Sequence, residues 1–164
     1  MQTNQIELTT FGPEYLEAAI RLSRHAGWPH RLEDWQMALA LSEGIVAVED
    51  GRVVGTVLVT PYKRDCATIN MVIVDEAVRG RGLGRKLMDA AFRIASDRPL
   101  RLVATAEGLP LYEKLGFGES DAVLHIRASS EKSPQRPNRR LRAPPMSKRS
   151  PNSTALPSAP TVER

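Results

Sequence analysis

Hydrophobic residues recur with two different periods along residues 1–128 and divide this part of the chain into helices and strands. Apolar residues three or four positions apart predict amphipathic helices. This spacing occurs at 13–27, 31–44, 83–96 and 108–116. Alternating or continuous apolar residues between turn residues predict strands. They occur at 5–10, 45–59, 67–74, 99–105 and 117–128. The order of these elements predicts one mixed α/β domain.

Two of the predicted strand segments carry a more specific signal. In the segment 45–59, Asp50-Gly51 interrupts two apolar runs. This dipeptide suits the two-residue turn of a β-hairpin, in which both central residues need a positive φ. The segment 67–74, ATINMVIV, is almost entirely apolar after Asn70. That composition predicts a strand buried on both faces.

The pattern ends near residue 129, where the composition changes. The segment from 129 to 164 holds 7 of the 12 prolines and shows no apolar period. Such a segment buries too little apolar surface to offset the entropy lost on ordering. We therefore expect a domain over residues 1–128 and a disordered basic tail, rich in Pro, Ser and Arg, over residues 129–164.

The net charge of +4 belongs to this tail. From Ser129 onward, 8 Lys and Arg stand against 2 Glu, whereas residues 1–128 hold 15 basic and 17 acidic residues. The sequence pI of 9.6 therefore describes the tail and not the body. Binding to a nucleic acid or another partner through basic charge would involve only the tail, and nucleic acid is not an expected ligand of the body.

Cysteine content and hydropathy narrow the class of protein further. Cys66 is the single cysteine, which excludes an internal disulfide or a multi-cysteine zinc site and fits a reducing compartment. The first residues lack the basic and apolar regions of a signal peptide, and no run of about 18 apolar residues occurs. We expect a cytoplasmic protein with neither a membrane span nor a metal.

The strongest candidate for chemistry is the glycine-rich stretch VRGRGLGRKLM at 78–88. It follows the buried strand and opens the helix predicted over 83–96. The first N–H groups of a helix have no internal partner, and the helix dipole adds positive charge there. Glycines let an anion approach the backbone closely, and arginines add charge. The stretch predicts a phosphate-binding loop, although a glycine-rich turn with solvated arginines is the plainer alternative.

Two familiar phosphate-binding motifs do not fit this stretch. A P-loop needs Lys followed by Ser or Thr, but Gly84 is followed by Arg-Lys-Leu. The dinucleotide fingerprint needs a third glycine five positions after Gly80, where Arg85 stands. The hairpin ahead of the strand also differs from the repeated βαβ units of dinucleotide-binding folds.

The stretch VIVDEAVRGRGLGRKLM, followed by GLPLYEKLGF, resembles the GNAT superfamily of N-acetyltransferases over residues 5–125. Arg79, Gly82 and Gly84 fill the acetyl-CoA signature of that superfamily. GWPHRLEDW and ATAEGLPLYEKLGF are similar to a bacterial YitH-like branch, of which the chain matches the N-terminal half. The resemblance implies a single GNAT-type acyltransferase domain with a mixed, mostly antiparallel sheet flanked by helices.

The resemblance also implies where acetyl-CoA, the co-substrate, would bind. In the superfamily the central strand pairs with the pantetheine arm, and here the matching residues are Val72, Ile73 and Val74. The pyrophosphate lies on the loop that follows. The matching loop residues are Arg79, Gly80, Arg81, Gly82, Leu83, Gly84 and Arg85. This assignment agrees with an anion at a helix N-terminus.

Tyr112 matches the tyrosine that commonly protonates the leaving CoA thiolate in this superfamily. A phenol with a pKa of about 10 stays protonated at neutral pH and can donate a hydrogen bond to a developing thiolate. The alternative is that Tyr112 only packs its ring against the core.

The group that deprotonates the amine is less evident. Many relatives use a glutamate on the central strand, and ATINMVIV contains none. Four residues of the first two helices remain as candidates: His25, His30, Glu33 and Asp34. Each also has a structural interpretation, as a solvated first turn or a surface histidine. Trp28 and Trp35 either line the acceptor cleft or anchor the core.

The sequence therefore indicates an acetyl-CoA-dependent N-acetyltransferase that acts directly on an amine, more readily a small molecule than a protein. Two alternatives remain, a non-catalytic CoA-binding module and a protein that binds partners through its tail. The acceptor amine is not encoded in the cofactor motifs. The sequence also leaves open whether the protein is a monomer or a homodimer.

Overall fold

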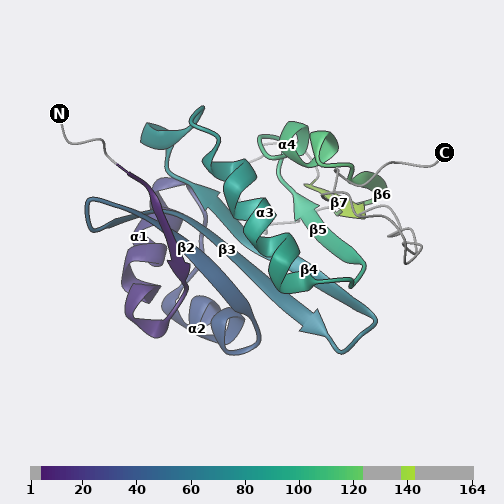
Figure 1. Cartoon of the computed structure of the whole chain (residues 1–164), viewed down its shortest axis with the longest axis horizontal. Helices are drawn as coiled ribbons and strands as arrows, with labels where there is room; N and C mark the ends of the chain where they lie inside the picture. Colours follow the sequence, from purple (N-terminus) through teal and green to yellow (C-terminus); the bar gives the residue numbers. More distant parts are fainter. Residues whose placement is uncertain (1–4, 124–137, 143–164) are drawn as a thin grey trace, which may run out of the picture. The chain divides into compact units, whose positions relative to one another are not determined.

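The computed structural model describes residues 5–123 and 138–142, which form two compact units that divide between Arg98 and Pro99. Elements of the first unit, in chain order, are β1 (Glu7–Thr10), η1 (Pro13–Tyr15), α1 (Leu16–His25), α2 (Leu32–Ala40), β2 (Glu43–Glu49), β3 (Arg52–Tyr62), β4 (Cys66–Val74), η2 (Glu76–Val78) and α3 (Leu83–Ala95). Those of the second unit are β5 (Leu100–Ala104), α4 (Leu109–Lys114), β6 (Gly118–Val123) and β7 (Asn138–Arg142). The mixed α/β fold predicted from the apolar pattern is confirmed (Figure 1).

The first unit is built on an antiparallel sheet in the order β1-β2-β3-β4. The turn between β2 and β3 is the predicted hairpin, and Asp50 and Gly51 have φ values of 48° and 74°. Both residues are thus left-handed, as the two-residue hairpin turn requires. The described residues contain no helix that is long and apolar enough to cross a membrane.

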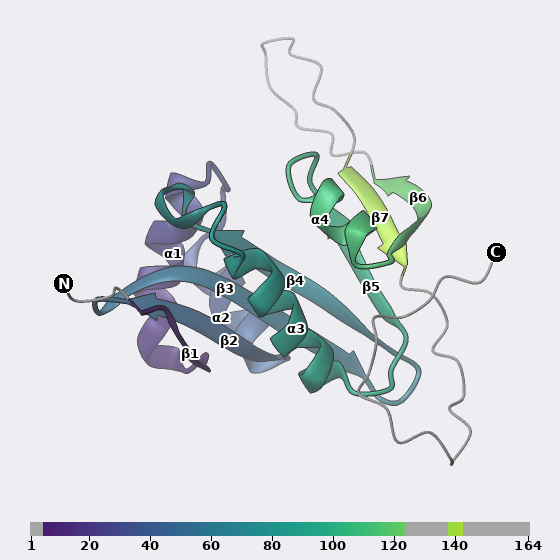
Figure 2. The same ribbon diagram turned by 45° about the horizontal axis from the view of Figure 1, so that its top comes forward.

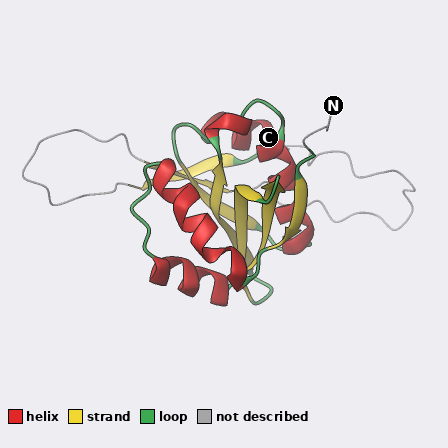
Figure 3. Ribbon diagram, turned by 90° about the vertical axis from the view of Figure 1, so that its left-hand side faces the viewer, coloured by secondary structure: helices red, strands yellow, loops and turns green. Residues whose placement is uncertain are grey.

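Helices cover both faces of this sheet (Figures 2 and 3). α1 and α2 cover one face, and α3 lies against the other. On the α3 side, a Cβ built at Gly55 of β3 would come within 3.0 Å of Leu87 and 3.2 Å of Leu83. Glycine at position 55 therefore lets the helix pack closely on the strand.

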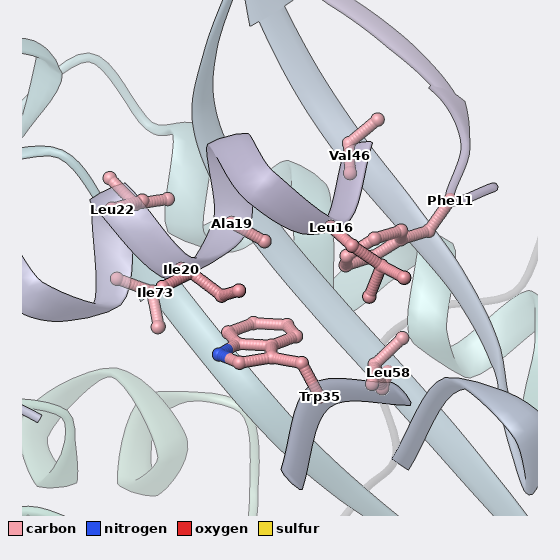
Figure 4. Packing of buried hydrophobic residues seen from close by; sticks show 9 residues of the cluster. All are labelled: Phe11, Leu16, Ala19, Ile20, Leu22, Trp35, Val46, Leu58 and Ile73. Carbon is pink, nitrogen blue, oxygen red and sulfur yellow. The ribbon is translucent and has the colours of Figure 1, made fainter. Parts of the chain in front are cut away.

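Trp35 of α2 lies at the centre of the core between the sheet and the first two helices (Figure 4). Its side chain is fully buried, and its ring lies 5.7 Å from that of Phe11. The remaining buried residues of this cluster are Leu16, Ala19, Ile20, Leu22, Val46, Leu58 and Ile73. These apolar contacts hold α1 and α2 on the sheet, and burial of apolar surface is the main favourable term of folding.

Replacing Trp35 by Ala is expected to lower the free energy of unfolding by about 3–5 kcal/mol, because it leaves a large cavity in the core. Met37 on the same helix is 63% exposed, so Met37→Ala is the matched control. That control should change the stability by no more than about 0.5 kcal/mol. Urea unfolding followed by circular dichroism measures both variants, and equal values for the two would contradict this description of the core.

The second helix ends earlier than the apolar spacing predicts. The prediction extended this helix to Gly44, whereas α2 ends at Ala40 and Glu43-Gly44 already belong to β2. Gly44 is opposite Leu58 of β3, and its carbonyl accepts a hydrogen bond from the backbone N–H of Phe11. These sheet contacts override the helical spacing of the last predicted turn.

The second unit contains a strand that the sequence did not predict. β7 pairs antiparallel with β5 on one side and with β6 on the other. The sequence predicted a disordered tail from residue 129, but Asn138–Arg142 form a strand in the structure. Pairing along both edges of this strand satisfies its backbone hydrogen-bonding groups. Residues 124–128, the end of the last predicted strand, lie outside the described residues, as does the rest of the predicted tail at 129–137 and 143–164.

Candidate active site

The predicted phosphate-binding loop connects β4 to α3 in the first unit. The Asp75 carboxylate accepts a hydrogen bond from the backbone N–H of Ala77 at 2.9 Å and so starts the short η2 turn. Gly80 and Gly82 then have φ values of 78° and 76°. These left-handed conformations suit glycine, which lacks the Cβ that makes them strained. The sequence places these glycines where the backbone reverses.

Gly82 is the N-cap of α3, and the first hydrogen bond of the helix runs from the Lys86 N–H to the Gly82 carbonyl at 3.1 Å. The N–H groups of Leu83, Gly84 and Arg85 therefore precede the first helical hydrogen bond. A Cβ built at Gly80 or Gly82 would meet nothing within 4 Å. The space beside both glycines is open, and helix N–H groups with a positive dipole adjoin it. An anion can therefore be accommodated there.

The arginines of this loop already contact acceptors in the protein. Arg79 lies 3.7 Å from Glu76 and donates to the Val74 carbonyl at 3.4 Å. Arg85 lies 3.5 Å from Asp89, one turn further along α3. The arginine charge near the loop is thus partly balanced by carboxylates. The backbone N–H groups that begin α3 are therefore the principal candidates for binding an anion.

The β4 strand, predicted to hold the pantetheine arm, contains a β-bulge. Leu58 of β3 is opposite Asn70, whereas Thr56 is opposite Ile73. One residue of β3 is therefore opposite two of β4, Met71 and Val72. Met71 has a φ of 51°, which is uncommon for a residue with a side chain. Bulges of this kind bend a strand and redirect its backbone groups, and they occur often beside active sites.

A buried hydroxyl group fixes the bulge. Thr56 is fully buried, and its hydroxyl donates to the Met71 carbonyl at 2.7 Å. This bond gives the displaced carbonyl a partner. The bulge was not predictable from the sequence, because Met71 stands where glycine or asparagine would be expected.

Replacing Thr56 by Val keeps the side-chain shape and removes this hydrogen bond. The expected loss is about 1–2 kcal/mol of unfolding free energy, because the Met71 carbonyl loses its partner. Thr68→Val is the matched control, since Thr68 lies on β4 opposite Thr60 and is partly buried. Urea unfolding measures both variants. A loss at Thr56 no larger than at Thr68 would show that the hydroxyl does not support the bulge.

Tyr112 belongs to α4 of the second unit. The side chain is 6% exposed, and its ring lies 6.1 Å from that of Phe117. A Cβ at Gly108 would approach the Tyr112 ring to 2.8 Å, so glycine makes room for the ring. Burial raises the pKa of Tyr112 to about 12. The phenol is therefore protonated at neutral pH and can donate a hydrogen bond or a proton.

The four candidates for the proton acceptor lie in the first unit and differ in their surroundings. His25 and Glu33 are exposed. Asp34 accepts a hydrogen bond from the backbone N–H of Arg31 at 2.8 Å and pairs with its guanidinium at 3.3 Å. That backbone hydrogen bond, followed by the side-chain bond, lowers the pKa of Asp34. Asp34 therefore serves the start of α2, as the structural interpretation of this residue predicted.

His30 is the one candidate held by a buried polar partner. Its Nδ1 atom lies 3.2 Å from the hydroxyl of Ser23, which is fully buried in α1. The imidazole also meets the rings of Trp28 and Trp35 in edge arrangements, at 5.3 and 6.3 Å. Burial lowers the pKa of His30, while the nearby Asp34 carboxylate opposes this effect. His30 is thus neutral at pH 7 and able to accept a proton.

The two tryptophans have different roles. Trp35 is a fully buried core anchor, whereas Trp28 is partly buried and packs against the edge of the same cluster. Met71, at the β4 bulge, packs against that cluster as well. The region of Trp28 and His30 therefore adjoins the same core as the bulge. Sequence reasoning could not distinguish the two tryptophans, because their spacing fits both roles.

Comparisons with known proteins agree with this arrangement. The family model described as "Acetyltransferase (GNAT) family" matches residues 5–117. The uncharacterized N-acetyltransferase YitH of Bacillus subtilis (strain 168) is 33% identical over 127 residues, which cover 71% of this chain and 42% of YitH. The chain thus spans less than half the length of the curated relatives it matches.

Solved structures show the same fold. The ribosomal-protein-S18-alanine N-acetyltransferase of Escherichia coli has a TM-score of 0.74 at 18% identity, over 92% of this chain and 100% of that one. Ard1 of Thermoplasma volcanium has a TM-score of 0.69 at 21% identity, over 84% of this chain and 94% of that one. At such low identities the likeness concerns the fold and not the acceptor.

Proposed function

Because the chain belongs to the GNAT family of acetyltransferases, we propose that it transfers the acetyl group of acetyl-CoA to an amine. The observation that supports this most directly is the loop between β4 and α3. Two left-handed glycines leave open space beside the N–H groups that begin α3. Pyrophosphate is a suitable ligand for such a site, since helix N-termini bind phosphate groups through N–H donors and the dipole.

The residues of β4 would hold the pantetheine arm. Val72, Ile73 and Val74 follow the bulge at Met71 and lead directly into the loop. In this arrangement a pantetheine arm would pass along the strand while the pyrophosphate occupies the loop. The thioester would then lie near the bulge, where the redirected backbone can donate to the carbonyl oxygen of the acetyl group.

The chemistry needs no covalent intermediate on the protein. The amine nitrogen attacks the thioester carbon, the carbon–sulfur bond breaks, and the amine loses a proton. A tyrosine whose pKa is about 12 transfers a proton to a thiolate of pKa about 8.5 only at a cost of about 5 kcal/mol. We therefore assign Tyr112 the donation of a hydrogen bond to the developing thiolate. The thiolate takes its proton from water as CoA leaves, and the proton lost by the amine passes to its acceptor and then to water.

We assign the acceptance of the amine's proton to His30. Its lowered pKa keeps the imidazole neutral, and its contact with Ser23 holds the ring. Asp34 is engaged in the start of α2, and β4 carries no carboxylate. A base acting directly or through one water needs a fixed position and a pKa near or below the working pH. His30 meets both conditions.

This assignment predicts a pH dependence. The folded protein holds the pKa of His30 below its usual value of 6.5, so the base form is lost only as the pH falls below about 6.5. We expect kcat/KM of the wild type to decline in that range. In His30→Gln, this decline should disappear and activity at pH 7 should fall by about 10²-fold or more. His25→Gln, the exposed control, should retain both the activity and the pH profile.

The proposed function is tested by the release of CoA from acetyl-CoA over a panel of small amines, amino acids, polyamines and peptides. We expect amine-dependent release with at least one small amine. The alternative is a non-catalytic CoA-binding module, which the lack of a carboxylate on β4 favours. Calorimetric binding of CoA without release by any amine would support that alternative, and a protein that binds no CoA would contradict both.

A further inference from the structure

The glycine loop is tied to the far end of the β2–β3 hairpin by an ion pair. Arg81, between the two left-handed glycines, donates to the Glu49 carboxylate at 2.8 Å. Glu49 ends β2, and its side chain is only 11% exposed, whereas that of Arg81 is 43% exposed. The bond also raises the pKa of Arg81. A short charged hydrogen bond with one partly buried partner fixes geometry better than an exposed ion pair does.

A second ion pair joins the same hairpin to the start of the loop. Arg52, which begins β3 and is paired with Glu49 across the turn, lies 3.7 Å from the Asp75 carboxylate. Asp75 is 17% exposed at its side chain, and it also accepts from the Ala77 N–H. The Asp75 N–H donates to the carbonyl of Val54 at 2.9 Å. The first residue of the loop is therefore held by both its backbone and its side chain.

The two pairs have opposite polarity. The hairpin contributes an acid, Glu49, to the arginine at the end of the loop and a base, Arg52, to the aspartate at its start. Glu49 and Arg52 thus each meet a loop residue of opposite charge, and exchanging the two partners would place like charges together. This arrangement specifies one position of the loop relative to the hairpin.

The position of Glu49 is informative because a carboxylate near a phosphate site opposes the binding of an anion. A side chain selected only to attract phosphate would not be acidic here. Its close contact with Arg81 offsets that repulsion and orients the loop. Order in the free loop increases affinity, because less conformational freedom is then lost when the ligand binds.

We propose that Glu49 and Arg52 are positioning residues that hold the loop from Asp75 to Gly82 ready for the pyrophosphate of acetyl-CoA. The proposal rests on the proposed function in one respect, which is that this loop binds CoA. It adds that the hairpin turn takes part in the site without contacting the ligand.

Calorimetric titration with CoA tests the proposal, because it requires no acceptor amine. We expect Glu49→Ala to weaken CoA binding about tenfold while the thermal midpoint and the far-ultraviolet spectrum stay unchanged. Glu49→Gln keeps an acceptor for Arg81 and should restore most of the affinity. Glu43→Ala, at the exposed start of the same strand, is the matched control and should bind CoA as the wild type does.

A second ligand distinguishes an effect of the substitution on the loop from an effect elsewhere in the site. S-acetylpantetheine lacks the pyrophosphate and the nucleotide, so its binding should be the same in the wild type and in Glu49→Ala. Equal CoA affinity in the wild type and Glu49→Ala would overturn the proposal. A similar loss for CoA and S-acetylpantetheine would also overturn it, since the effect would then lie outside the loop. A wild type that binds no CoA would instead contradict the proposed function.

Discussion

Replacing Gly82 by Val is expected to abolish CoA binding while the protein remains folded. Gly82 has a φ of 76° and open space beside it, so a side chain there meets no protein atom. Valine would instead occupy the space that the pyrophosphate needs, next to the first N–H groups of α3. Its β-branched side chain also disfavours a positive φ and would move the N-cap. Calorimetry with CoA measures the loss.

The matched control for this variant is Gly27→Val, which lies just after α1. Gly27 has a φ of 72°, and a Cβ there also meets nothing within 4 Å. Both variants therefore carry the same backbone strain, of about 1–3 kcal/mol. Only Gly82 adjoins the helix N-terminus. Equal CoA affinity in the two variants would show that the pyrophosphate does not bind at this loop.

Replacing Tyr112 by Phe is expected to lower kcat by on the order of 10²–10⁴ and to leave the KM for acetyl-CoA close to the wild-type value. The ring keeps its packing against Phe117, so the fold is preserved. Only the hydroxyl, which would stabilise the departing thiolate, is lost. Steady-state kinetics with the best amine of the panel provide the measurement.

Tyr62→Phe is the control for this variant, because Tyr62 is 53% exposed at the end of β3. It should change neither constant. Full activity of Tyr112→Phe would show that water or another group stabilises the thiolate. A rise in KM with an unchanged kcat would indicate a role in binding and not in the chemical step.

The parts of this molecule that follow local rules could be predicted from the sequence. Asp50-Gly51 encodes its own turn, since both residues tolerate a positive φ. Gly80 and Gly82 likewise mark the reversal of the chain before α3, and the apolar spacing of α3 defines the helix. The candidate anion site was predictable because it consists of backbone N–H groups at the start of a helix.

Features that depend on distant residues could not be predicted in this way. The bulge at Met71 needs the hydroxyl of Thr56 on the neighbouring strand. Arg81 and Glu49 are 32 residues apart and meet only after the sheet has formed. β7 is a strand because both of its edges are paired, although its own residues show little apolar alternation. Tertiary contacts determine each of these features, because such contacts often override weak local preferences for helix or strand.

The most direct test of the proposed transfer follows the acetyl group itself. The wild-type protein is mixed with the best amine of the panel and acetyl-CoA that is isotope-labelled in its acetyl group. The label is measured in the amine and on the intact protein, and the amount of released CoA is measured in parallel. The account predicts one labelled amine for every CoA released and no label on the protein at any time. CoA bound without labelled amine, or label accumulating on the protein before it reaches the amine, would contradict direct transfer to an amine.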